Sequence, residues 1–165
     1  MTKSFVKIRF QLDTSDWHGH GSETLWAEPV AKTKGDILRI ANSPYFTTGI
    51  NHCDVVRAKA GGNGLLFDFL DVVERGGHST YMILAIPEDL RLVSYWTPLQ
   101  DRGCSYESMT INLSEGRRLL YSVDVPPDAN IYEVYGLLEQ GESDGVWKFQ
   151  EGFADLPNSS APKNS

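Results

Sequence analysis

Short stretches of alternating apolar and polar residues, separated by turn-forming residues, fill the first 75 positions, which contain no convincing helix. Residues 5–12, FVKIRFQL, have the two-residue period of a half-buried strand. Pro29 favours an edge or a bulge, and turns at 34–36 and 61–64 join hairpins. Further extended patterns cover residues 23–30, 37–41, 55–60 and 65–73. Strands at such short spacing predict a small, strongly bent antiparallel sheet or barrel.

The second half of the chain adds helix signals to the strands. Residues 79–86, STYMILAI, form a mostly apolar run that suits a central strand. Thr97 stands before Pro98 as an N-cap stands before the first helical residue, so a helix is predicted to begin there and to stop at Gly103. Residues 88–96 form either a separate helical turn or the first part of a longer, kinked helix.

A hairpin, a second helix and a last strand follow. The hairpin pairs 105–113 with 117–125, and the last strand covers 146–151. Asn130 opens a capping box, and Gly141 is expected to end the helix that follows it. The apolar face of this helix contains Ile131, Val134, Tyr135 and Leu138. The order strand, helix, strand, strand, helix, strand is that of a ferredoxin-like split βαβ unit.

The chain is therefore predicted to be an α+β protein with two lobes. Residues 1–75 form the N-terminal β lobe, residues 76–156 the ferredoxin-like lobe, and residues 157–165 a disordered polar tail. The start of the chain has no signal-peptide pattern, and no apolar run approaches the ~20 residues of a membrane span. We expect a soluble, cytoplasmic protein in which Cys53 and Cys104 remain free thiols.

Negative charge is concentrated at the C-terminal end. From residue 124 onward, eight carboxylates are accompanied by two lysines, whereas residues 1–123 carry 13 basic and 14 acidic side chains. Most of the net charge of −7 therefore lies in the last quarter. Such a field attracts a basic partner and repels nucleic acids and anionic membranes, although an acidic surface also serves solubility alone.

Several blocks stand out along the sequence, in the order LWAEPV, NSPYFTTGI, CDVVRA, GGHST, RGCSYE, YSVDVPPD and LLEQGESDGVWKFQEG. Together they resemble a bacterial family known only as domain of unknown function 4265. The resemblance spans residues 5–154 and brings no activity or catalytic residue with it. The C-terminal part is also similar, in the order of its elements, to the ferredoxin-like fold of the protein regulators of RNase E, which implies a binding role.

The residues that could carry chemistry form no recognised catalytic motif. Four histidines invite a metal site, with Cys53 next to one of them and two carboxylates nearby: His18, His20, His52, His78, Asp16 and Asp54. The loop that holds His18 and His20 contains two glycines and is a poor platform for ligands, so we expect no metal and no cofactor. Cys53 follows His52 directly, and neighbouring residues of an extended chain face opposite ways, which disfavours a cysteine–histidine dyad. A non-enzymatic role is favoured, while a site assembled from distant loops remains an open alternative.

The leading functional hypothesis is a protein that binds a basic protein partner, in its sharper form an immunity or antitoxin protein that neutralises a toxin. Its oligomeric state is not predicted. The partner-binding surface is expected to contain Glu139, Glu142, Asp144, Trp147, Phe149 and Glu151. The alternative is a small-molecule-binding protein or enzyme with a cleft between the lobes, lined by Asn42, Tyr45, His52, Asp54 and His78.

Overall fold

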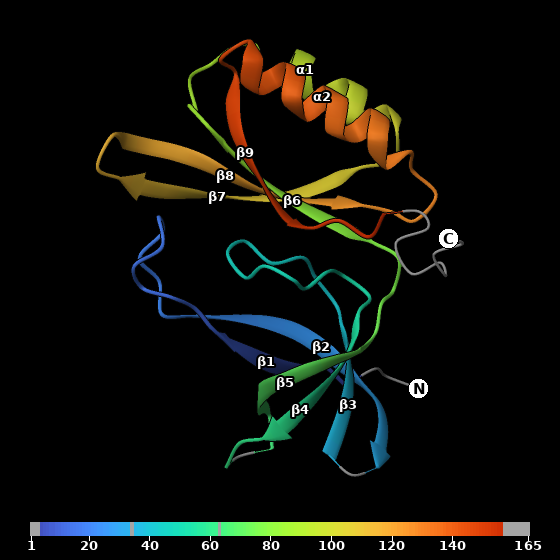
Figure 1. Ribbon diagram of the computed structural model, residues 1–165. Helices are drawn as coiled ribbons and strands as arrows, with labels where there is room; N and C mark the ends of the chain where they lie inside the picture. The colour runs from blue at the N-terminus through green and yellow to red at the C-terminus, as the bar shows by residue number, and fades with distance from the viewer. Residues whose placement is uncertain (1–3, 34, 63, 157–165) are drawn as a thin grey trace, which may run out of the picture.

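In the computed structural model, a closed five-stranded barrel stands below a four-stranded sheet that two helices cover (Figure 1). The structure describes residues 4–33, 35–62 and 64–156. The predicted disordered tail and turn positions 34 and 63 lie outside these residues. The barrel strands are β1 (Val6–Gln11), β2 (Ser22–Thr33), β3 (Gly35–Ile40), β4 (Val55–Ala60) and β5 (Leu66–Glu74). The other elements are β6 (Ser79–Ala85), α1 (Leu92–Asp101), β7 (Ser105–Leu113), β8 (Gly116–Val125), α2 (Ile131–Ser143) and β9 (Trp147–Phe153).

The barrel confirms the alternating pattern of the first 75 residues. Neighbouring strands from β1 to β5 pair antiparallel, and a register shift between Pro29 and Ala31 places a bulge at the proline. The expectation of a purely antiparallel sheet is wrong at one seam, because β1 and β5 pair parallel. In a closed ring of five strands whose consecutive members alternate in direction, the first and last strands must run the same way. The interior is apolar and includes Ile8, Leu38, Ile40 and Val56.

The second lobe has the strand order β7-β8-β6-β9, and all of its pairs are antiparallel. Each helix connects two strands that are separated by one other strand, and both helices pack on the face directed away from the barrel (Figure 1). The apolar core between helices and sheet includes Tyr81, Leu99, Tyr121, Val134 and Leu138. No helix in the described ranges is long and apolar enough to cross a membrane.

Helix α1 begins earlier than the sequence predicted. It starts at Leu92, so Thr97 is not its N-cap but an interior residue, whose hydroxyl donates to the Val93 carbonyl at 2.8 Å. Pro98 lies inside the helix, where its missing N–H costs one backbone hydrogen bond. The burial of Leu92 and Trp96 against the sheet favours helix on both sides of the proline. Of the two alternatives that the sequence left open for residues 88–96, the structure has the longer helix.

Helix α2 begins as predicted but ends later. The Asn130 side chain accepts hydrogen bonds from the backbone N–H groups of Tyr132 and Glu133, which confirms the cap. Gly141 does not end the helix, which continues to Ser143. Instead, Gly141 makes room for the indole of Trp147, because a Cβ atom at this position would collide with the ring. The indole Nε1 donates to the Leu138 carbonyl at 3.0 Å.

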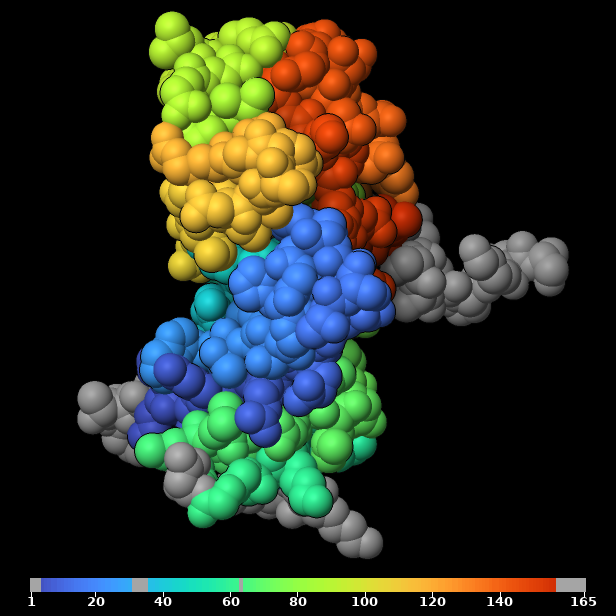
Figure 2. Space-filling model, turned by 90° about the vertical axis from the view of Figure 1, so that its left-hand side faces the viewer, coloured from blue at the N-terminus to red at the C-terminus, as the bar shows by residue number. Residues whose placement is uncertain are grey.

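The two lobes meet where barrel loops cover the open face of the sheet. Tyr45 and Phe46, in the β3–β4 loop, pack against a cluster of sheet residues that includes Met82 and Leu120. The Ser122 hydroxyl donates to the Pro44 carbonyl at 2.6 Å. Figure 2 shows the blue N-terminal segment seated against the yellow β7–β8 region and the red β9 region. Both faces of the sheet are therefore covered, one by helices and the other by loops.

The helix register makes a testable prediction. Leu138 is fully buried and Glu139 is exposed, so Leu138→Ala should lower the free energy of unfolding by ~2–5 kcal/mol. Glu139→Ala should change it little, because an exposed carboxylate contributes little to stability. Denaturant titration measures both. Equal losses from the two substitutions would contradict the orientation of α2.

The two glycines of α2 provide a matched pair. Gly141→Ala should destabilise the protein by ~1–3 kcal/mol, because the new methyl group must displace Trp147. Gly136 is exposed, and a Cβ there meets no atom within 4 Å, so Gly136→Ala should stabilise by ~0.5–1 kcal/mol through helix propensity. Thermal denaturation should show melting temperatures that move in opposite directions. A stabilising effect of both substitutions would show that Gly141 serves only as a flexible point.

Candidate functional site

Side-chain acceptors fix the long β3–β4 loop, residues 41–54, between the lobes. The Asn42 side chain accepts a hydrogen bond from the Trp26 backbone at 2.8 Å. The Glu23 carboxylate accepts from the backbone N–H groups of Tyr45, Phe46 and Thr47 at 2.7–3.1 Å. Hydrogen bonds to a carboxylate are stronger than neutral ones, so Glu23 of β2, with Asn42 of the loop itself, determines the path of the loop.

The end of this loop is held by a fully buried carboxylate, Asp54. It accepts hydrogen bonds from the backbone of Asn51 and Gly76, at 2.9 and 3.0 Å, and from the Arg75 guanidinium at 2.8 Å. Arg75 also donates to the Gly49 carbonyl and lies 3.8 Å above the ring of Phe153. The sequence alternative expected Asp54 to line a cleft. Instead, its oxygens accept hydrogen bonds from the loop and from the segment that enters β6.

This clamp leaves Cys53 in an unusual backbone conformation. Its φ of +72° is the one positive value among the described residues other than glycine. Such a conformation costs ~1–3 kcal/mol for a residue with a side chain. Gly76 packs so closely on the Cys53 carbonyl that no Cβ fits between them, and the Cys53 N–H donates to the Ile40 carbonyl at 2.9 Å. The surrounding contacts thus hold Cys53 in place against this cost.

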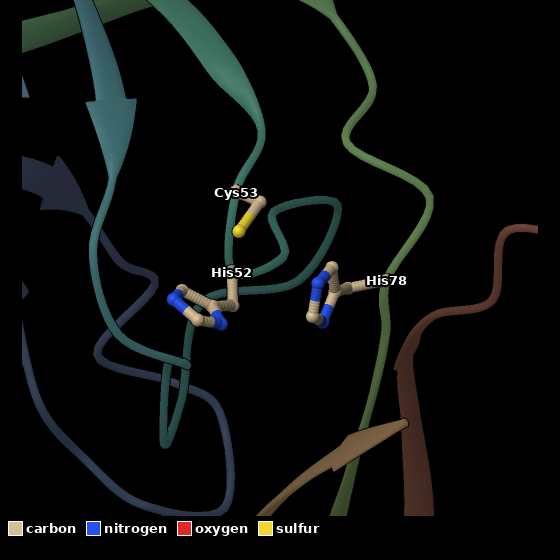
Figure 3. A group of neighbouring side chains, drawn as sticks. All are labelled: His52, Cys53 and His78. Carbon is tan, nitrogen blue, oxygen red and sulfur yellow. The ribbon is translucent and has the colours of Figure 1, made fainter. Parts of the chain in front are cut away.

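Cys53 lies beside two imidazoles that approach from different segments. His52 precedes it in the loop, and His78 stands directly before β6, so that all three side chains point into one space (Figure 3). One ligand atom from each residue falls within 4.8 Å of the others. His78 Nδ1 lies 2.9 and 3.0 Å from the two carboxylate oxygens of Asp124 in β8. The sequence named His52 and His78 in one cleft but had no signal for Asp124.

The pKa shifts of His52 and Cys53 favour the neutral form of each side chain. Burial lowers the pKa of His52, and the nearby Asp124 carboxylate opposes that shift without reversing it. Burial and the same carboxylate raise the pKa of the Cys53 thiol. The thiol is therefore a poor nucleophile at neutral pH. Cys104 is buried, and this burial raises its pKa to about 12.

Two cavities lie where the lobes meet. A small polar cavity of about 160 Å³ adjoins the histidines and is lined by residues that include Asn42, His52, Tyr106 and Asp124. A larger apolar cavity of about 310 Å³ lies between Trp17 and the open face of the sheet, against Met82, Leu84, Leu113, Leu120 and Phe149. Of the five residues predicted for a cleft, Asn42 and His52 line the polar cavity. Tyr45 instead packs on the sheet cluster.

His18 and His20 lie apart from the group of three. Their rings pack on Phe46, with centroid distances of 4.7 and 4.4 Å, and the His18 Nδ1 atom accepts a hydrogen bond from the His20 backbone. Burial lowers the pKa of His18. Within the described residues, these two histidines belong to no group with metal-ligand spacing. His52, which the sequence suggested as a third ligand beside them, lies instead with Cys53 and His78.

The acidic surface predicted for the C-terminal lobe differs in its aromatic members. Trp147 is 3% exposed, so it is a core residue and not an exposed anchor. Tyr132 and Tyr135 are 63% and 39% exposed and lie on the outer side of α2, although the sequence placed Tyr135 on the buried face. The Tyr135 ring touches Phe149 edge-on at 5.6 Å, which joins α2 to β9.

The predicted carboxylates fall into two groups. Glu142 accepts a hydrogen bond from the Phe149 backbone, and Asp144 accepts from the Tyr95 hydroxyl and the Gln140 side chain. Glu139 and Glu151 are exposed and form no hydrogen bond or ion pair with another described residue. We call the surface formed by Tyr132, Tyr135, Glu139, Glu142 and Glu151 the acidic face.

Comparison with known proteins identifies a family and one structural neighbour. No curated protein matches the chain. The structure resembles the crystal structure of a hypothetical protein from Neisseria gonorrhoeae, with a TM-score of 0.60 and 13% sequence identity, over 95% of this chain and 99% of that one. At this identity the likeness extends to the fold alone. Residues 23–149 match the family described as Domain of unknown function (DUF4265), and the chain belongs to that family.

Proposed function

We propose that the protein is a non-enzymatic binding protein whose acidic face recognises a basic partner protein. The observation that carries this proposal is the exposure of Tyr132 and Tyr135 on the same side of α2 as Glu139. Residues 132, 135 and 139 are spaced three and four apart, so they form one stripe along the helix. Tyrosines provide large contact area at low entropic cost, and neighbouring carboxylates select a basic surface.

The distribution of charge around β9 supports the same proposal. Glu151 and Phe149 alternate with Lys148 along the strand, so the lysine belongs to the opposite side of the sheet, where it adjoins the apolar cavity. Lys148 is the one lysine or arginine in residues 124–156, and the acidic face thus has no basic side chain from this part of the chain. A basic partner meets uncompensated carboxylates there.

The sharper form of the proposal is an immunity or antitoxin protein that covers a basic toxin. A concentrated negative face accelerates the encounter with such a partner, and the two tyrosines slow its release. The same field disfavours nucleic acid and anionic membranes as partners. A toxin-like reading frame beside the gene would support this form, whereas a metabolic operon would favour the small-molecule alternative.

For the fold of the C-terminal lobe, we propose the ferredoxin-like class. The strand order β7-β8-β6-β9, with a helix after its first and third strands in sequence, supports this assignment. The likeness to the protein regulators of RNase E is part of the same proposal and concerns the fold alone.

The acidic face can be tested with two charge-matched double variants. Glu139→Gln with Glu151→Gln removes two carboxylates from the face, and Glu74→Gln with Glu107→Gln removes two exposed carboxylates elsewhere. Proteins from a host lysate are captured on the wild-type chain, and a captured basic protein is then purified. At low salt, the first variant should slow its association on the order of 10-fold, with little change in melting temperature. The second variant should bind like the wild type.

The tyrosines are tested separately from the charges. Tyr132→Ala removes an exposed ring, so it should mainly increase the dissociation rate of the captured protein without unfolding the chain. Circular dichroism checks the fold, and surface plasmon resonance measures both rates. Equal slowing of association by both double variants would indicate a general charge effect. Association and dissociation rates that change neither with salt nor with any of these substitutions would refute the proposal that the acidic face binds the partner.

The larger cavity favours a second candidate function, the binding of a small apolar ligand between the lobes. Its volume of about 310 Å³ reaches the lower end of the range for ligand pockets, and Lys148 at its edge suits an anionic group. An anilinonaphthalene sulfonate dye should therefore fluoresce when mixed with the folded protein. Leu113→Trp, which fills the cavity, should abolish the signal, and Leu70→Trp in the barrel should not. An unchanged signal with Leu113→Trp would exclude this cavity.

A further inference from the structure

We propose that His52, Cys53 and His78 bind a transition-metal ion of the Zn²⁺ class at the junction of the lobes, with Asp124 as the outer carboxylate that orients His78. The proposal is independent of the acidic face. It rests on three ligand atoms that lie within 4.8 Å of one another and on the hydrogen bond that directs one of the imidazoles (Figure 3).

The chemistry of the donors selects the metal. One sulfur and two imidazole nitrogens suit Zn²⁺ and similar ions, whereas Mg²⁺ and Ca²⁺ prefer oxygen ligands. Three protein ligands leave a fourth tetrahedral position for water or another ligand. In such a site, donor atoms lie roughly 3.3–3.6 Å apart. The present separations, which are no longer than 4.8 Å, exceed this by up to about 1.5 Å, which side-chain rotation towards the ion closes.

The hydrogen bond from His78 to Asp124 has the form found around bound metals. A ligating histidine usually gives its second N–H to a carboxylate, which fixes the ring and strengthens the ligand. Here Nδ1 faces both oxygens of Asp124, and Nε2 is left for an ion. The ring nitrogens of His52 form no hydrogen bond with another described residue, so they are available. The imidazole of His52 also lines the small polar cavity, which gives the site a route to solvent.

The third ligand is held by the backbone. Cys53 keeps its positive φ because Gly76 packs on its carbonyl and Asp54 ties the neighbouring segments together. A ligand whose position is determined by the scaffold loses little freedom on binding. The charged groups near the thiol are the carboxylates of Asp124, Asp54 and Glu28 and the guanidinium of Arg39, so the local field favours a cation.

The ligands also come from both lobes. His52 and Cys53 belong to the barrel loop, while His78 directly precedes β6 and Asp124 lies in β8. A bound ion therefore connects the lobes directly, and its binding free energy adds to the stability of the folded chain. Metal binding can therefore be detected through stability as well as through site occupancy, because the bound ion should raise the unfolding temperature of the whole protein.

The full-length chain, purified without a tag and treated with a chelator, is titrated with Co²⁺. Binding of one ion per chain should produce a thiolate-to-cobalt charge-transfer band that Zn²⁺ removes by displacement. Cys53→Ser should abolish this band, and His52→Ala and His78→Ala should weaken binding. Asp124→Asn should weaken it by ~10–100-fold while the band persists, as expected for an outer-shell partner. Zn²⁺ should raise the melting temperature of the wild type but not of Cys53→Ser.

Three controls make the result decisive. Cys104→Ser and the double variant His18→Ala with His20→Ala should bind Co²⁺ like the wild type. Cys53→Gly suits the positive φ, so without metal it should be at least as stable as the wild type, yet it should show no charge-transfer band. Loss of cobalt binding in the His18/His20 variant but not in Cys53→Ser would identify an adventitious histidine site and overturn the proposal. Absence of the band in the folded wild type would also overturn it.

Discussion

The buried carboxylate of Asp54 is the interaction on which the rest of the structure depends. An unpaired charge with no exposed surface would strongly destabilise the fold, so its oxygens require the backbone N–H groups of Asn51 and Gly76 and the guanidinium of Arg75. These partners lie in the barrel loop and in the segment that enters β6. Because Arg75 also covers the ring of Phe153, one buried charge joins the barrel, the connecting segment and the last strand.

The need to cover both faces of the sheet explains why the two lobes are in contact. Helices bury one face, and the other carries apolar side chains such as Met82 and Leu120. The barrel supplies the missing layer through its loops, which Glu23 and Asp54 hold in shape by accepting backbone hydrogen bonds. Two cavities lie at this junction, between the barrel loops and the sheet. The features that could bind small ligands are thus consequences of how the sheet is covered.

The sequence predicted the local structure better than the tertiary contacts. Alternation located the strands, and the cap at Asn130 located the start of α2, because both signals depend on near neighbours. Gly141 was misinterpreted as a helix end because its purpose is contact with Trp147, six residues away and in another element. Trp147 was placed on the surface for the same reason, because its burial depends on that contact with α2. Tyr135 was placed on the buried face because a helical period marks a face without showing its width. The sequence grouped His52 with His78 and noted Cys53 beside His52, but the approach of Asp124 to His78 had no sequence signal.

The pairing state of each carboxylate separates structural from functional acids in this protein. Asp54 and Glu23 accept hydrogen bonds from backbone N–H groups, and Asp124 is hydrogen-bonded to His78. The negative charge of these three residues therefore organises the junction of the lobes. Glu139 and Glu151 have no such partner among the described residues, and their charge is directed to solvent. A count of acidic residues along the sequence treats the two kinds alike. The folded arrangement divides them between an interior that needs negative charge for its own order and a surface on which that charge is available to another molecule.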